Sequence, residues 1–141
     1  MDLKGFIRTW KGQLVRGGQC VGLYRQYIVD VWKIAAGLEG LGATGGAEGL
    51  FTRFHSDVGP RTRQFCELIE FRPGMVPQAG DVVVFRSTPT NRFGHVAIFV
   101  EPGKQPNTME VFEQNGFRLD GAKMATWNYD RVMGWLRLRA A

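Results

Sequence analysis

Cysteine is scarce in this chain, and long hydrophobic segments are absent. The two cysteines, Cys20 and Cys66, are too few for a disulfide framework. No run of about 18 apolar residues occurs, so no segment is suited to cross a membrane. The opening residues, Met1 to Gly5, hold no apolar core of a secretory signal. We therefore expect no signal peptide, no membrane insertion and reduced thiols, because disulfides persist mainly in oxidising compartments.

Acidic residues are the minority charge. The sequence has 18 lysines and arginines against 13 aspartates and glutamates, a formal net charge of +5. An anionic partner is favoured, and nucleic acid, an anionic membrane surface and the bacterial cell wall all qualify. No lysine- or arginine-rich run and no zinc-ligand spacing supports nucleic-acid binding. The length of 141 residues predicts a single domain over residues 1–141 with a substantial core.

The first half of the sequence has helical periodicity and the second half has the features of strands. Apolar spacing predicts helices over residues 2–16 with an end near Gly12, from Cys20 to about Ala36, and over 47–55. The glycine-rich residues 37–49 are predicted to form a loop. Strands are predicted over residues 65–71, 82–85, 95–100, 109–115 and 132–138. Helices followed by strands indicate an α+β fold, with N-terminal helices packed on an antiparallel sheet.

A glycine-rich turn leads into the second predicted helix at Cys20. Gly17 and Gly18 allow the chain to turn tightly and leave the sulfur open to a substrate. At a helix start, unpaired backbone N–H groups and the positive end of the helix dipole point at the sulfur. This environment favours the thiolate, which is the nucleophilic form of cysteine. A small apolar residue buried at a helix start is the alternative interpretation.

Two predicted strands carry polar residues within apolar segments. His95 opens one of them, and Glu113 and Asn115 lie two apart near the end of the other. Side chains two apart on a strand share a face, so either Glu113 or Asn115 reaches His95 if the strands are neighbours. The Cys20 helix must pack on this sheet, so a thiol, an imidazole and an orienting group would converge, as acyl transfer requires. A strand histidine with a satisfied hydrogen bond and a solvated polar strand face are the alternatives.

Four short segments occur in an order typical of one known family. They are Gly18 to Cys20 (GQC), Pro77 to Phe85 (PQAGDVVVF), Gly94 to Ile98 (GHVAI) and Phe112 to Asn115 (FEQN). This set resembles the CHAP domain, the cysteine, histidine-dependent amidohydrolase/peptidase family, a papain-like group common in bacteriophage lysins and bacterial wall hydrolases. The resemblance implies Cys20 as the nucleophile, His95 as general base and acid, and Glu113 as the residue that orients His95. It also implies that Asn115 supports the site and that Gln19 helps line the oxyanion pocket.

The activity implied by the resemblance is hydrolysis of an amide bond of peptidoglycan. The bond lies either between sugar and peptide, as for an N-acetylmuramoyl-L-alanine amidase, or within the peptide, as for an endopeptidase. We expect a monomer without a cofactor, made in the host cytoplasm and acting on the cell wall, or carried on a phage particle. Several family members bind calcium through acidic residues before the cysteine. Residues 11–18 contain no carboxylate, so no metal is expected there, because calcium needs several anionic oxygen ligands.

Three other classes of function remain open. A cysteine endopeptidase of the NlpC/P60 type would have a second histidine in the orienting position, where this sequence offers Glu113 and Asn115. The other histidine, His55, is predicted to lie at the surface, and Cys66 is predicted to be a core thiol of a strand. A non-catalytic cell-wall-binding or phage structural module and a basic nucleic-acid binder are the remaining alternatives.

Overall fold

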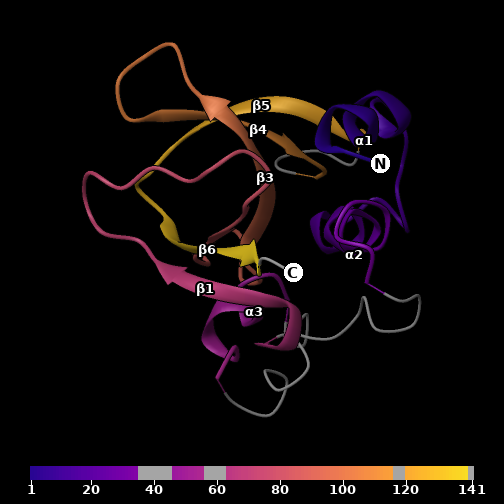
Figure 1. The fold of residues 1–141 in the computed structure, drawn as a ribbon. Coiled ribbons are helices and arrows are strands. Elements are labelled where there is room, and N and C mark those ends of the chain that lie inside the picture. The colour runs from indigo at the N-terminus through magenta and orange to yellow at the C-terminus, as the bar shows by residue number, and fades with distance from the viewer. Residues whose placement is uncertain (35–45, 56–62, 116–119, 140–141) are drawn as a thin grey trace.

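The computed structural model describes residues 1–34, 46–55, 63–115 and 120–139 (Figure 1). The helices of this part of the chain are α1 (Leu3–Trp10), α2 (Cys20–Asp30) and α3 (Gly49–Thr52). The strands are β1 (Cys66–Glu70), β2 (Val82–Phe85), β3 (His95–Pro102), β4 (Thr108–Glu113), β5 (Lys123–Asn128) and β6 (Val132–Leu138). They form one antiparallel sheet in the order β1-β6-β2-β3-β4-β5, which confirms the predicted α+β class. None of the described helices is long and apolar enough to cross a membrane.

The predicted helices are present but shorter than expected. α1 ends at Trp10 because the following residues pair with a distant segment, where Gly12 N donates to Ala122 O over 2.8 Å. α2 ends at Asp30 rather than near Ala36, and Lys33 has a left-handed φ of 61° that an α-helix does not continue. α3 has four residues within the predicted range 47–55. Ala36 and residues 37–45 of the predicted loop lie outside the described residues.

All five predicted strands are present with small shifts at their ends, but β5 has no counterpart in the prediction. β5 is an edge strand that pairs with β4 alone. It alternates the exposed polar residues Thr126 and Asn128 with the partly buried Ala125 and Trp127. Half of an edge strand faces solvent, so its hydrophobic signal in the sequence is weak.

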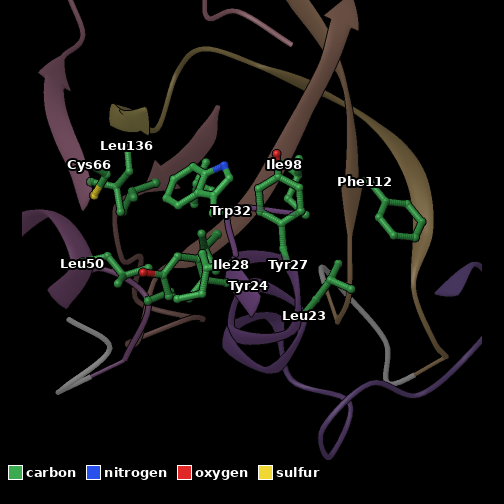
Figure 2. Close-up of a cluster of buried hydrophobic side chains, with 14 of the residues drawn as sticks. Leu23, Tyr24, Tyr27, Ile28, Trp32, Leu50, Cys66, Ile98, Phe112 and Leu136 are labelled. Atoms are coloured by element: carbon green, nitrogen blue, oxygen red, sulfur yellow. The ribbon is translucent and has the colours of Figure 1, made fainter. Parts of the chain in front are cut away.

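The two faces of the sheet support two separate hydrophobic clusters. Strand alternation directs Val96 and Ile98 toward the helices, and Ala97 and Phe99 toward the opposite face. In Figure 1, α1 and α2 lie together on one side of the curved sheet. Figure 2 shows side chains of α2, including Tyr27, extending from the helix toward strand residues such as Ile98.

Tyr27 anchors α2 between α1 and the sheet. Its hydroxyl donates to Gly80 O over 2.8 Å, in the turn before β2. Its ring makes edge contacts with Phe6 of α1 at 5.2 Å and with Trp32 at 5.7 Å between ring centroids. Full burial of a large apolar side chain contributes about 1.5–3 kcal/mol. These contacts hold α2, and therefore its first residue Cys20, in a defined position against β3.

The close approach of α2 to the preceding turn predicts that Gly22→Ala is destabilising. A Cβ atom at residue 22 would lie 2.7 Å from Arg16 O and 2.8 Å from Val15 O, and both are backbone atoms. We expect a loss of about 1–3 kcal/mol in the free energy of unfolding, because the two segments must separate. Chemical denaturation monitored by circular dichroism measures the change.

Gly5→Ala in α1 is the matched control. A Cβ atom there meets only side-chain atoms, Asp2 Oδ1 at 3.1 Å and Met1 Cγ at 3.2 Å, and a small shift relieves both contacts while Asp2 still caps the helix through Gly5 N. Alanine is also up to about 1 kcal/mol better than glycine inside a helix. Gly5→Ala should therefore leave stability unchanged or raise it, and an equal loss in both variants would contradict the packing argument.

Candidate active site

Cys20 is the first residue of α2 and follows directly on a turn containing two glycines. Gly17 and Gly18 have left-handed φ angles of 90° and 86°, which glycine adopts at little steric cost. Gln19 caps α2 in an extended conformation, and its side chain makes no capping hydrogen bond. The first N–H groups of a helix have no partner within the helix. The partly exposed Cys20 thiol therefore lies beside open N–H donors at the positive end of the helix dipole.

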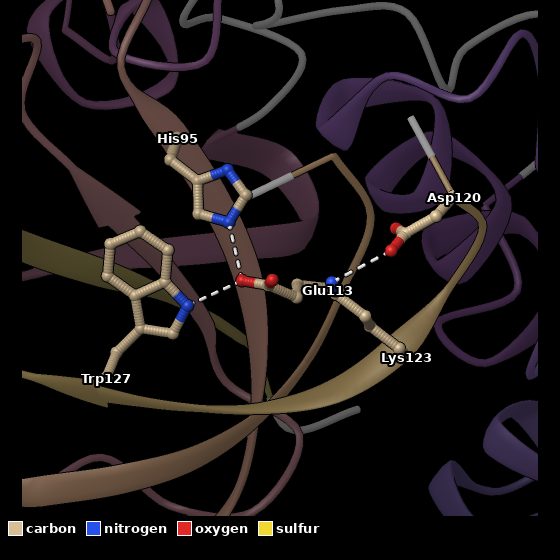
Figure 3. Close-up of polar contacts among 5 residues, drawn as sticks. All are labelled: His95, Glu113, Asp120, Lys123 and Trp127. Atoms are coloured by element: carbon tan, nitrogen blue, oxygen red, sulfur yellow. Dashed lines mark hydrogen bonds and ion pairs between the residues drawn. The ribbon is translucent and has the colours of Figure 1, made fainter. Parts of the chain in front are cut away.

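His95 and Glu113 contact each other across the neighbouring strands β3 and β4. His95 is the first residue of β3 and Glu113 is the last residue of β4, and the two strands pair antiparallel. His95 Nε2 lies 3.0 Å from Glu113 Oε1, and each side chain is only 1% exposed. In Figure 3 the Glu113 carboxylate lies between the imidazole of His95 and the indole of Trp127. An isolated buried carboxylate is costly, so this geometry favours an oppositely charged partner at His95.

The environment of His95 favours its protonated form. Burial alone would lower the pKa of His95, because it disfavours the charged imidazolium. Cys20 and Glu113 outweigh this effect and raise the pKa to about 9. Nδ1 of His95 is buried and makes no hydrogen bond of normal geometry with the described residues. Cys20 lies near enough to raise the pKa of His95 but makes no hydrogen bond of normal geometry with it. Because Nε2 contacts Glu113, Nδ1 is the ring nitrogen that remains for the Cys20 thiol.

The thiol and the imidazole approach each other at the beginning of β3, not across the helix-packed face of the sheet. Val96 points toward the cluster that contains α2, and Cys20 packs against the same cluster. His95 points to the opposite face, where its ring lies 5.8 Å from that of Phe85. Because His95 is the first residue of its strand, the helix start can reach its imidazole past the strand end.

The structure separates Glu113 from Asn115. β4 ends at Glu113, and Asn115 has a left-handed φ of 58°, so strand alternation does not extend to it. The expectation that both residues share one strand face is therefore wrong. Glu113 is the residue bonded to His95, whereas Asn115 Nδ2 donates to Gln19 Oε1 over 2.6 Å. Asn115 thus lies beside the residue that precedes Cys20.

Gln114 builds the site, although the sequence analysis does not single it out. Its side chain is fully buried, and Oε1 accepts from Val15 N over 2.6 Å. Nε2 donates to Val15 O and to Gln19 O, each over 2.8 Å. One amide therefore ties the end of β4 to the turn before Cys20. Glutamine is mostly exposed in proteins, so its identity alone gave no signal of this burial.

The other candidate residues lie elsewhere. His55 is exposed on the turn after α3, as predicted. Cys66 is fully buried in β1, and burial raises the pKa of its thiol to about 12, which confirms the predicted core position. Among the described residues, no group of three histidine, cysteine, aspartate or glutamate side chains is placed to hold a metal ion.

The fold and the three side chains define an α+β domain with a thiol at a helix start beside a buried imidazole and carboxylate. The family model described as CHAP domain matches residues 10–115. The chain therefore belongs to the CHAP domain family, which confirms the resemblance inferred from the four sequence segments. A search of curated proteins gives no match.

Solved structures share the fold. Ly7917, crystallised "with the hydrolyzing product of MDP", matches with a TM-score of 0.70 and 20% identity over 94% of this chain and 60% of that chain. The wild-type endolysin LysIME-EF1 matches with a TM-score of 0.63 and 19% identity over 97% of this chain and 64% of that chain. At these identities the likeness concerns the fold, and this chain spans less than two thirds of the length of either structure.

Gln114→Glu should lower the free energy of unfolding by about 2–4 kcal/mol. The substitution removes both hydrogen bonds that Nε2 donates, and it places a carboxylate oxygen next to the carbonyl oxygens of Val15 and Gln19. Denaturant unfolding measures the loss. Gln105→Glu is the matched control, because the Gln105 side chain is exposed and the residue accepts a hydrogen bond from Thr108 through its backbone carbonyl, which the substitution keeps. If both variants unfold at the same denaturant concentration, the buried amide does not hold the turn.

Proposed function

We propose that this protein is a peptidoglycan hydrolase that cleaves an amide bond of the bacterial cell wall through Cys20, His95 and Glu113. The observation that carries the proposal is the buried His95–Glu113 pair next to a thiol at a helix start. A nucleophile, a base and a group that orients the base are the parts that acyl transfer by a cysteine enzyme requires.

In the proposed mechanism, the Cys20 thiolate attacks the amide carbonyl while His95 is protonated. The C–N bond breaks as His95 gives its proton to the leaving amine, and the acyl group remains on Cys20 as a thioester. The neutral His95 then takes a proton from a water molecule that hydrolyses the thioester. Glu113 fixes the imidazole orientation and stabilises its positive form through a charge-assisted hydrogen bond.

The start of α2 would stabilise the oxyanion that develops during attack. The backbone N–H of Cys20 is one donor, and the side-chain amide of Gln19 is the neighbouring one. Asn115 Nδ2 donates to Gln19 Oε1, which leaves the amide nitrogen of Gln19 to face away from Asn115 and toward a substrate oxygen. In this proposal Asn115 supports Gln19 rather than His95.

The cell wall as substrate is supported by the family, the charge and the fold neighbours. One neighbour is an endolysin, and another was solved with the hydrolysing product of MDP. A net charge of +5 suits an anionic polymer. The reaction is that of an N-acetylmuramoyl-L-alanine amidase or of a peptide endopeptidase, since both break an amide. We further propose that residues 1–141 form one catalytic domain, which acts as a monomer and needs no cofactor. In this proposal the protein is made in the host cytoplasm and acts on the cell wall, or is carried on a phage particle.

Digestion of purified peptidoglycan with mass analysis of the released fragments tests the proposal. New lactyl carboxylates paired with free alanine amines would mark an amidase, and new termini inside the peptides would mark an endopeptidase. Cys20→Ser should release no measurable fragments while its circular dichroism spectrum stays that of the wild type, because a hydroxyl is a far weaker nucleophile at neutral pH.

Cys66→Ala is the matched control for the loss of a thiol. It should keep most of the activity, because Cys66 is buried in β1 away from His95. An inactive but folded Cys66→Ala would mean that the wrong thiol has been assigned. Binding of the wild type to peptidoglycan without any fragment release would instead identify a non-catalytic wall-binding module.

Glu113→Gln should slow the chemical step by about 10²-fold or more, because an amide supports the imidazolium less well than a carboxylate. Glu113 helps to raise the pKa of His95, so the alkaline limb of the pH–rate profile should also move to lower pH. Single-turnover hydrolysis of a soluble wall fragment measures both effects. Asn115→Ala is the comparison and should cost less, and the opposite order would assign the orienting role to Asn115.

A further inference from the structure

Trp127 of β5 donates a hydrogen bond to the same carboxylate oxygen that contacts His95. Its Nε1 lies 2.5 Å from Glu113 Oε1, and His95 Nε2 lies 3.0 Å from that atom (Figure 3). In the register of β4 and β5, Trp127 is opposite Met109 and Glu113 is opposite Lys123. The indole therefore reaches back along the face toward Glu113, over the position of the small residue Ala125.

The indole also covers the imidazole. The rings of Trp127 and His95 are stacked, with centroids 5.0 Å apart and an interplanar angle of 22°. The ring of Phe85, on β2, also contacts the indole, with 4.8 Å between the two ring centroids. Trp127 thus contacts both members of the buried pair, one through its N–H group and the other through its ring face, and it encloses them on the side of β5.

We propose that Trp127 is a positioning residue for the thiol chemistry of this site: its N–H group and its ring hold the Glu113 carboxylate and the His95 imidazole against each other, so that His95 is in place to activate Cys20. This inference rests on the proposed function for its link to catalysis. Its effect on the thiol is a property of the folded protein and is measurable without any substrate.

The physical reason is the cost of a charge in a buried site. Glu113 is 1% exposed, so water contributes little to the stability of its ionised form. A hydrogen bond donated to a carboxylate favours the charged form, and the charged form in turn stabilises the imidazolium of His95. Without the indole N–H, the carboxylate is a weaker and less well aligned partner, so the imidazolium of His95 is less favourable and supports the reactive form of the Cys20 thiol less well.

Among the described residues, few other charges act on this network. Cys20 of α2 and Glu113 of β4 are the ionisable groups in the described part of the chain that act on the imidazole. The Arg131 guanidinium, just before β6, lies 5.7 Å from the centroid of the indole. Lys123 of β5 is opposite Glu113 in the register but forms an ion pair of 3.2 Å with Asp120. A change of titration in a Trp127 variant therefore reports mainly on the Glu113–His95–Cys20 series.

The test is the rate of alkylation of Cys20 by iodoacetamide as a function of pH, followed by intact mass. It is performed in a Cys66→Ala background, so that one thiol remains. Trp127→Phe keeps an aromatic ring but removes the N–H group, so the midpoint pH of alkylation should rise by about half a pH unit or more. Glu113→Gln should raise the same midpoint further. A profile that superimposes on that of the parent overturns the proposal.

Trp135→Phe is the matched control. Trp135 is buried in the same hydrophobic cluster as Phe85, and its Nε1 has no hydrogen-bond partner among the described residues. The substitution Trp135→Phe removes an indole of equal size but no hydrogen bond to Glu113, so the midpoint pH of alkylation should stay unchanged. An equal shift in the Trp127→Phe and Trp135→Phe proteins would show a general packing effect and overturn the specific role.

Replacement of Trp127 by benzothienylalanine covers the case in which Trp127→Phe fails to fold. This residue keeps the bicyclic ring and exchanges the N–H for sulfur, so the upward shift should persist if the hydrogen bond is responsible. In steady-state hydrolysis, either variant should lower kcat about 10-fold with KM within about twofold of the parent value, as expected for a lost transition-state effect. A change confined to KM would overturn the positioning role.

The two proposals fail in different ways. If the protein does not hydrolyse peptidoglycan but the Trp127 variants shift the alkylation midpoint, the proposed substrate is wrong and the positioning role holds. If hydrolysis is found and the alkylation profiles coincide, the function holds and the role of Trp127 is wrong.

Discussion

A carboxylate buried in a hydrophobic sheet face is unfavourable unless donors surround it, and Glu113 satisfies this condition through two neighbouring strands. His95 reaches it from β3 and Trp127 from β5, and both contact the same oxygen. Because unpaired burial of such a charge costs several kcal/mol, β3, β4 and β5 must keep their register at this point. The polar pair therefore specifies the local arrangement of the sheet as well as the chemistry that we propose for it.

The second constraint is the placement of a helix-borne thiol next to a strand-borne imidazole. Glu113 is the last residue of β4 and Gln114 follows it directly, and their side chains bond segments on opposite sides of the sheet. Glu113 lies on the side of His95 and Trp127, whereas the amide of Gln114 bonds the turn before Cys20 on the other side. Two adjacent residues thus hold the imidazole on one side and the turn before Cys20 on the other. That turn lies about a hundred positions before Gln114 in the chain.

The residues that sequence analysis located and those that it missed differ in the kind of signal they carry. Cys20 follows a glycine turn, and His95 opens an apolar strand, so each is unusual within its own segment. Gln114 and Trp127 are not, because their importance depends on partners in other segments. β5 was missed for a related reason: it is an edge strand with one solvated face, and half of its residues give no apolar signal. The expectation that Glu113 and Asn115 share one strand face was wrong because it extended strand alternation beyond Glu113, where the backbone changes conformation.

The sequence by itself determined the α+β class, the helix that begins at Cys20 and the strands of His95 and Glu113, since periodicity and turn residues are local properties of the chain. It also determined the CHAP family through four short segments. The tertiary structure alone decided that Asn115 leaves the strand face of Glu113 and bonds Gln19, that Gln114 ties the sheet to the Cys20 turn, and that an indole completes the buried pair. These outcomes depend on where strands end, on register and on the satisfaction of buried polar groups, and such conditions exist only once distant segments have packed together.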